Sequence, residues 1–105
     1  MLSANLTNKE RKAIYRRDGF ACALCDCRKY LTVHHYIKRS LGGSNSPHNL
    51  ITLCTYCHNH VHGTPLYDTG MTQEEVEQCI VEYLADMYAP DWNPWRKDSE
   101  PWRRE

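Results

Sequence analysis

The run Leu50-Ile-Thr-Leu-Cys-Thr-Tyr-Cys-His-Asn-His-Val-His-Gly63 decides the fold, because it joins a short apolar strand to a helix that carries potential metal ligands. Leu50 to Leu53 has the apolar and β-branched content of a strand. Cys54 to His62 contains no helix breaker before the final glycine, which is typical of a capped helix end. On that helix the i to i+4 spacing puts His58 and His62 on one face, as two ligands of one metal ion require.

Four of the six cysteines form two CxxC pairs, Cys22 with Cys25 and Cys54 with Cys57. Together they can supply four thiolates to one tetrahedral zinc ion, the geometry of a closed structural site. The 28 residues between the pairs exceed the ~15 to 20 of a simple zinc ribbon, so the pairs must bracket an inserted unit. Cys27 could replace Cys25 in a wider pair, and this alternative stays open.

The inserted unit is predicted to be a hairpin with a long loop. Tyr30 to Ile37 is rich in β-branched and aromatic residues and predicts a first strand, and Ser40 to Pro47 has the composition of a loop. His34 and His35 are adjacent in the first strand, so their side chains should point to opposite faces. One of them can join the two helix histidines as a third ligand. The other is left free to move a proton, as imidazole does near neutral pH.

Two further helices are expected on either side of this unit. The capping box from Thr7 to Glu10 begins a short basic helix that ends at Asp18-Gly19. A second capping box from Thr72 to Glu75 begins an amphipathic helix that reaches about Tyr88 and has an acidic outer face. Cys79 lies on its apolar side and is expected to be a core residue. The last 15 residues hold all three tryptophans. The sequence predicts one α+β domain over residues 1–105, with a core at about 11–63, the acidic helix at 72–89 and a Trp-rich tail at 90–105.

The distribution of charge and the hydropathy of the sequence indicate some classes of function and exclude others. The net charge of the 105 residues is zero, but residues 1–63 balance at +6 and residues 64–105 at −6, which suggests a nucleic-acid face on the first part. The mean hydropathy of −0.72 and the lack of any apolar run of ~20 residues exclude a membrane span. No signal-peptide pattern is visible at the start. We therefore expect a cytoplasmic protein whose thiols are reduced and bind metal.

Several motifs resemble a known family. They are Arg16-Arg17-Asp18-Gly19-Phe20-x-Cys22, Leu31-Thr32-Val33-His34-His35, Gly42-Gly43, and Asn49 to Cys54 followed by Cys57-His58-x3-His62. Over residues 11–62 this pattern closely resembles the HNH endonucleases with a four-cysteine zinc site, particularly the small phage-encoded ones. The resemblance implies a ββα-metal (His-Me finger) core, a hairpin plus helix that grips one divalent ion.

The resemblance also implies roles for single residues. His34 and His58 would be metal ligands and His35 the general base, while Asn49 would orient the strand of the base through a loop hydrogen bond. His62 sits where some members have a further ligand and others do not. Lys38 departs from the proline that many members carry there, which affects loop geometry more than chemistry.

The expected activity is metal-dependent hydrolysis of DNA phosphodiester bonds, as nicking or double-strand cleavage of low sequence specificity, giving 5′-phosphate and 3′-hydroxyl ends. The expected cofactors are a structural zinc ion on the cysteines and an exchangeable Mg, Mn, Ni, Co or Zn ion on the histidines. Candidate DNA contacts are Arg16, Arg17, Lys38 and Arg39. His48 and His60 are interpreted as exposed histidines or phosphate contacts.

Other interpretations stay open. The chain could be a non-catalytic zinc-binding module for DNA or protein, although the full set of histidines argues against it. By analogy with phage members it could assist terminase subunits in genome packaging, in the host cytoplasm. The tryptophan tail could either dock a partner or wrap over the small core. The sequence does not decide between a monomer and a dimer.

Overall fold

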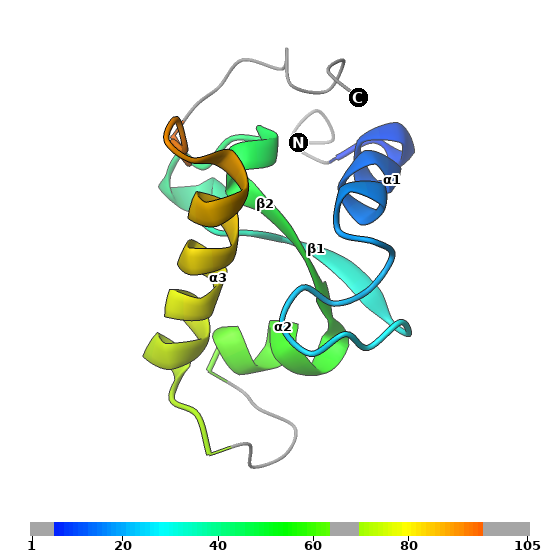
Figure 1. Cartoon of the computed structure of the whole chain (residues 1–105), viewed down its shortest axis with the longest axis vertical. Coiled ribbons are helices and arrows are strands. Elements are labelled where there is room, and N and C mark those ends of the chain that lie inside the picture. The colour runs from blue at the N-terminus through cyan, green and yellow to red at the C-terminus, as the bar shows by residue number, and fades with distance from the viewer. Residues whose placement is uncertain (1–5, 64–69, 96–105) are drawn as a thin grey trace.

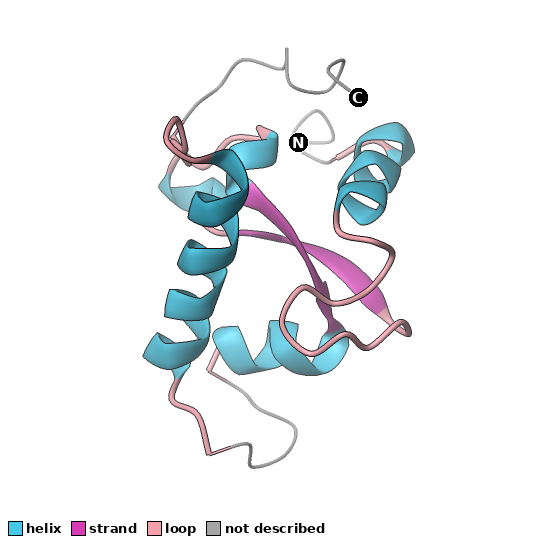
Figure 2. Ribbon diagram, in the orientation of Figure 1, coloured by secondary structure: helices cyan, strands magenta, loops and turns pink. Residues whose placement is uncertain are grey.

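The computed structural model, which describes residues 6–63 and 70–95, has a two-stranded hairpin between two helices (Figure 1). The elements are α1 (Asn8–Arg17), β1 (Leu31–His35), β2 (Leu50–Cys54), α2 (Thr55–Val61) and α3 (Gln73–Tyr88), with short 3-10 turns at Arg39–Leu41 and Pro47–Asn49. Figure 2 shows how few of these residues are strand. This arrangement confirms the predicted α+β class and its order of two strands followed by a short helix.

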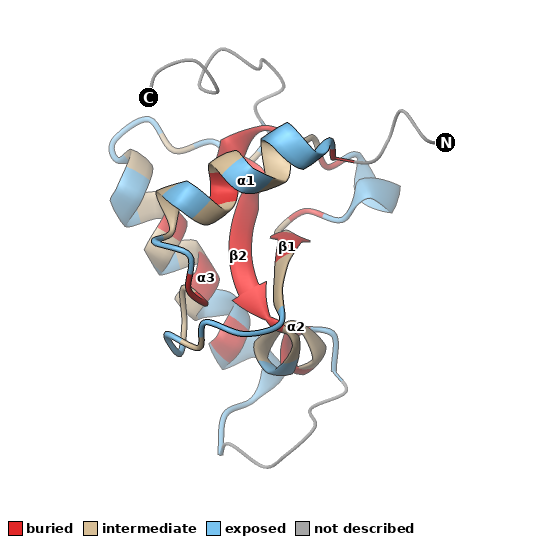
Figure 3. Ribbon diagram, turned by 90° about the vertical axis from the view of Figure 1, so that its right-hand side faces the viewer, coloured by how far each residue is buried: buried red, intermediate tan, exposed pale blue. Residues whose placement is uncertain are grey.

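The hairpin is buried from both sides. β1 and β2 are antiparallel, from Leu31 opposite Cys54 to His35 opposite Leu50. On one side Ile14 of α1 packs with Leu50, and on the other side Ile80 of α3 packs in a larger cluster around β2. All five residues of β2 are therefore buried (Figure 3). This explains why β2 is apolar at every position except Thr52 instead of alternating.

Both long helices begin where their capping boxes predict. In α1 the Thr7 side chain accepts from the Glu10 backbone N–H at 3.1 Å, and the Glu10 carboxylate accepts from the Thr7 N–H at 2.9 Å. Thr72 and Glu75 repeat the pair at the start of α3, at 3.1 and 2.8 Å. Each box satisfies backbone donors that a helix start leaves without intrahelical partners.

The first strand is shorter than the predicted span of residues 30–37. Tyr30 has a left-handed φ of 58°, which ends the extended strand there, although its carbonyl still accepts from the Thr55 N–H at the start of α2. At the other end the Tyr36 N–H donates to the Asn49 carbonyl. The expected loop at residues 40–47 also includes part of a 3-10 turn. A Cβ at Gly43 would overlap the Ile37 carbonyl, so glycine lets this loop close onto the end of β1.

The interpretation of His48 and His60 as exposed residues is wrong. His48 is 3% exposed, stacks on Tyr88 at 4.1 Å between ring centroids, and accepts from the Asn93 N–H at Nδ1. His60 is 7% exposed, and its Nε2 lies 2.8 Å from the Met71 carbonyl. Both are covered by segments distant in sequence, so neither is available for a phosphate.

Cys79 is also placed differently from the expectation of a core position. It is only partly buried, and with Leu24 and Met87 it lines an open groove between α3 and the first cysteine pair. The helix turns Val76, Ile80 and Leu84 into the core instead.

The described part of the tail, residues 90–95, covers one end of the hairpin. The Trp92 Nε1–H donates to the His48 carbonyl at 2.9 Å, and its ring lies 6.0 Å from that of Tyr36. Trp95 is 55% exposed, and Trp102 lies outside the described residues. Within residues 6–63 and 70–95, no helix is both long and apolar enough to span a membrane.

Candidate functional site

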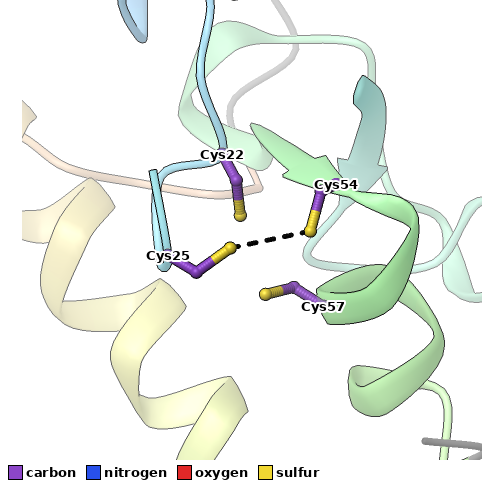
Figure 4. Close-up of side chains that lie close together, drawn as sticks. All are labelled: Cys22, Cys25, Cys54 and Cys57. Atoms are coloured by element: carbon purple, nitrogen blue, oxygen red, sulfur yellow. Dashed lines mark hydrogen bonds between the residues drawn. The ribbon is translucent and has the colours of Figure 1, made fainter. Parts of the chain in front are cut away.

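Four thiols converge at the corner where β2 runs into α2 (Figure 4). Cys22 and Cys25 come from the loop after α1, Cys54 ends β2, and Cys57 lies in the first turn of α2. The four sulfurs all lie within 4.8 Å of one another, and those of Cys25 and Cys54 are 3.7 Å apart. Zn–S bonds of ~2.3 Å in a tetrahedron place sulfurs about 3.8 Å apart. The donor set and its spacing therefore fit one zinc ion.

Without a metal ion these thiols share protons unevenly. A hydrogen bond from Cys57 lowers the pKa of Cys22 to about 4, and the same bond raises the pKa of Cys57. Burial raises the pKa of Cys25 to about 11. One thiolate is thus stabilised by neighbours that keep their hydrogens. Metal ligation requires thiolates, so an ion entering this cluster would displace the remaining protons.

The alternative ligand Cys27 does not join the cluster. Its sulfur contacts the Lys29 carbonyl at 3.6 Å, and its backbone carbonyl accepts from the Cys22 N–H. The group of four close sulfurs is the one with Cys25. Cys27 therefore helps to shape the loop that presents the first pair.

Three imidazoles form a second cluster, one from β1 and two from α2 and its end. The nitrogens of His34, His58 and His62 lie within 4.8 Å of one another. The His34 ring centroid is 5.0 Å from that of His58 and 5.3 Å from that of His62, with the rings edge to face. The structure thus brings together the strand histidine and the two helix histidines that the spacing selected, including His62.

Burial keeps two members of this second cluster, His34 and His58, uncharged. Burial, followed by the charges that His58 and His62 would carry, lowers the pKa of His34 to about 3. Burial and the neighbouring His62 lower the pKa of His58 as well. Neutral imidazoles are the form that binds divalent ions. Three imidazole donors at short range fit a metal ion that keeps open positions.

His35 lies on the opposite face of β1, as the strand geometry predicts. Its register partner Leu50 packs with α1, whereas His34 faces α2. The His35 Nε2 is 2.8 Å from the Asn45 side-chain oxygen. That oxygen can only accept, so Nε2 carries the hydrogen and Nδ1 keeps its lone pair. Burial lowers the pKa of His35, Asn45 opposes this, and Arg39 and Arg11 lower it further.

Asn49 ties the loop to the end of β1. Its side-chain oxygen accepts from the Ile37 N–H at 2.6 Å, and its amide donates to the carbonyls of Ile37 at 3.1 Å and Ser44 at 2.9 Å. Asn49 itself is fully buried. The residue therefore fixes where the chain goes immediately after His35.

The four basic candidates divide into two groups. Arg16, Lys38 and Arg39 are exposed. The expectation that Arg17 contacts DNA is wrong, because its side chain is only 11% exposed. Its guanidinium is paired at 2.8 Å with the carboxylate of Asp18, whose side chain is 0% exposed. It also donates to the carbonyls of Pro47 and Leu50. Burial opposes its charge, but the bond to Asp18 raises the pKa of Arg17 overall.

Comparison with known proteins agrees with this geometry. Residues 22–64 match the model of the HNH endonuclease family. The match spans the thiol cluster, the imidazole cluster and the loop between the strands, while α1 and α3 lie outside it. No curated protein and no solved structure matches the chain. The family is one of endonucleases, so the match indicates nuclease activity in general terms.

Two polar residues around this site could not be found from the sequence. The sequence predicts only a turn-forming run at Asn45, whereas in the structure Asn45 is the hydrogen-bond partner of His35. The sequence predicts only a helix end at Asp18, whereas its side chain also accepts from the Thr52 N–H and the Tyr83 hydroxyl. A polar residue in a loop carries no sign of its distant partner, so the sequence offered no signal for either contact.

Proposed function

We propose that this chain is a metal-dependent endonuclease that hydrolyses phosphodiester bonds of DNA, with His35 as the general base. The observation that carries the proposal is that the two adjacent histidines of β1, His34 and His35, have different surroundings. His34 faces two further imidazoles, whereas the His35 ring is held through Nε2 by Asn45, which leaves the lone pair of the neutral ring on Nδ1. A metal site alone would require only the first arrangement. A second, neutral and oriented imidazole beside it is what general-base catalysis requires.

His34, His58 and His62 would hold the divalent ion, which could be Mg, Mn, Ni, Co or Zn. When bound, such an ion supplies Lewis-acid stabilisation of charge on the phosphate and on the departing 3′-oxygen. His35 accepts the proton of the attacking water at Nδ1, while its Nε2–H stays bonded to Asn45. The lowered pKa of His35 keeps it unprotonated at neutral pH. Hydrolysis would leave 5′-phosphate and 3′-hydroxyl ends, as the family resemblance implies.

The thiol cluster has a structural role in this proposal, holding zinc through Cys22, Cys25, Cys54 and Cys57. Asn49 positions the base by fixing the loop after β1. We further propose that α3 and residues 90–95 belong to the same domain, because α3 completes the core around β2. The expectation of terminase subunits as partners rests on the phage-type resemblance alone.

A supercoiled-plasmid assay tests the catalytic proposal. Protein with zinc in the thiol cluster is supplied with Mg²⁺, Mn²⁺, Ni²⁺, Co²⁺ or Zn²⁺ in turn, beside His35→Ala, His58→Ala and the exposed control Gln78→Ala. We expect nicked or linear DNA from the parent and the control, and a loss of about 10²- to 10⁴-fold for His35→Ala. Folded protein that binds DNA but cleaves it with none of these ions would support the non-catalytic module instead.

Three exposed basic side chains would contact the DNA backbone: Arg16, Lys38 and Arg39. Each phosphate contact removed should reduce the slope of log affinity against log salt by about 1. Arg16→Ala is expected to show this reduction with unchanged stability. The neighbouring Arg17→Ala should instead destabilise the fold by about 3–5 kcal/mol, because it leaves Asp18 buried without its partner. Equal salt slopes for the parent and Arg16→Ala would remove Arg16 from the interface.

A further inference from the structure

Thr32 lies beneath the imidazole cluster on the same face of β1 as His34. The two residues are two positions apart in the strand, so their side chains point to the same side. In the antiparallel register Thr32 is opposite Leu53 and His34 is opposite Ile51. Leu53 and Ile51 both pack in the cluster that includes α3. The hydroxyl of Thr32 therefore lies on the side of the sheet where α2 carries His58.

Two short hydrogen bonds meet at the Thr32 hydroxyl. Its Oγ1 is 2.8 Å from the Leu53 carbonyl and 2.7 Å from Nδ1 of His58. A threonine hydroxyl has one hydrogen to donate, and a carbonyl oxygen can only accept. The single hydroxyl hydrogen is thus used on Leu53. The bond to His58 must then run the other way, from Nδ1–H to Oγ1.

The direction of this bond decides which nitrogen of His58 can bind a metal ion. With the hydrogen on Nδ1, a neutral ring has its lone pair on Nε2. A metal-ligating histidine almost always donates its other ring N–H to a fixed acceptor, which sets both the tautomer and the ring orientation. We propose that Thr32 is a positioning residue that holds His58 as the Nδ1–H tautomer and directs Nε2 to the imidazole cluster.

This inference rests on the proposed function, because it assigns His58 to a metal site. Thr32 itself touches neither substrate nor metal ion. The backbone carbonyl of Leu53 anchors the arrangement, so β2 as well as β1 determines how His58 is presented. Loss of such an outer partner lowers metal affinity by about 10–100-fold in comparable sites.

The test compares Thr32→Val, which keeps the shape of the side chain but removes the acceptor, with Thr32→Ser, which keeps the hydroxyl. Thr55→Val is the matched control, because its hydroxyl bonds the Tyr30 carbonyl and no histidine. Two readouts apply to protein that holds zinc in its thiol cluster. Nitrogen NMR of the protein before Ni²⁺ is added identifies the tautomer of His58, and calorimetric titration gives the affinity for Ni²⁺.

We expect His58 to be the Nδ1–H tautomer in the parent, in Thr32→Ser and in Thr55→Val, and to lose this preference in Thr32→Val. The Ni²⁺ affinity of Thr32→Val should fall by about 10–100-fold, with Thr32→Ser close to the parent. Equal affinity and an unchanged tautomer in Thr32→Val would overturn the proposal, as would a loss in Thr32→Ser as large as that in Thr32→Val.

Failure of the proposed function gives a different result. A parent protein that does not bind Ni²⁺ through its histidines contradicts the metal site, while the NMR spectra still decide the role of Thr32. If Thr32→Val does not fold, the parent spectrum is sufficient, since His58 with its hydrogen on Nε2 overturns the inference directly. Finding that hydrogen on Nδ1, with Thr32→Ser unchanged, supports it.

Discussion

The thiol cluster and the imidazole cluster of this chain share a segment but differ in the charge of their donors. The first has four thiols and the second has three imidazoles, and each takes two members from Cys54 to His62. Four thiolates close a tetrahedral zinc ion and more than cancel its charge. Three neutral imidazoles leave positions open and the ion's charge intact. One nine-residue run thus contributes both to a site suited to holding structure and to a site suited to chemistry.

The largest effect is expected from a substitution that removes one of the four thiols of the first cluster. Cys54→Ser should abolish zinc binding and with it most of the folded state, because structural zinc contributes about 10–16 kcal/mol of binding free energy in small domains, as much as a domain's whole stability. Metal analysis and circular dichroism measure both losses. Cys27→Ser is the control and should keep its zinc, since Cys27 stands outside the cluster. A Cys54→Ser protein that retains zinc and its fold would refute the structural role.

The next largest effect is expected from a substitution that affects the imidazole cluster and leaves the thiol cluster unchanged. His62 is exposed, so His62→Ala should leave the melting temperature and the bound zinc unchanged. It should weaken Ni²⁺ binding at the imidazoles by more than the roughly 10–100-fold that loss of an outer partner causes. Calorimetry on zinc-loaded protein checks this. Unchanged Ni²⁺ affinity would show that the site uses His34 and His58 alone.

A third effect concerns the loop that follows His35, the proposed general base. Asn49→Ala removes the acceptor of the buried Ile37 N–H and should cost about 1–3 kcal/mol of unfolding free energy. Asn49→Asp keeps an acceptor but loses the amide that donates to Ile37 and Ser44. Urea denaturation compares the two. The interpretation requires Asn49→Ala to lower the stability of the fold while zinc stays bound, and equal stability to the parent would contradict it.

The smallest effect is a shift with pH. Burial and the charges of Arg39 and Arg11 lower the pKa of His35 from 6.5, so the base stays neutral to a lower pH and cleavage should fall only below 6.5. Arg39→Gln removes one of these positive charges, which raises the pKa and moves the acidic limb to higher pH. The rate of single-turnover cleavage at saturating enzyme, measured as a function of pH, gives the position of this acidic limb. Lys12→Gln on α1 is the control. If the acidic limb moves equally in both variants, Arg39 has no specific effect on the pKa of His35.

Local patterns predicted much of this molecule correctly. Thr7 with Glu10 and Thr72 with Glu75 act within one helical turn, so their capping could be inferred from spacing alone. Alternation along a strand likewise predicted that His34 and His35 face opposite sides. The two CxxC pairs indicated four converging sulfurs because each pair is fixed by its own short turn.

The errors arise where a distant segment covers a residue. Arg17 stands in a basic run, but Asp18 and the carbonyl of Leu50 enclose its guanidinium. His48 stands in a polar loop, but Tyr88 and Asn93 cover it. Composition gives the polarity of such residues and no information on what folds over them. Asn45 was missed for the same reason.

The shortness of α2 has a consequence for the order of assembly. Its seven residues are well below the ~12–15 at which an isolated helix becomes even marginally stable in water. The helix therefore depends on its tertiary contacts, with Cys54 and Cys57 at its beginning and Val61 in the core at its end. The i to i+4 spacing that pairs His58 with His62 exists only once those thiols are fixed. We thus expect zinc to bind to the thiols first and the imidazole site to form second. Without zinc in the thiol cluster, the imidazole site would not form and would bind no divalent ion.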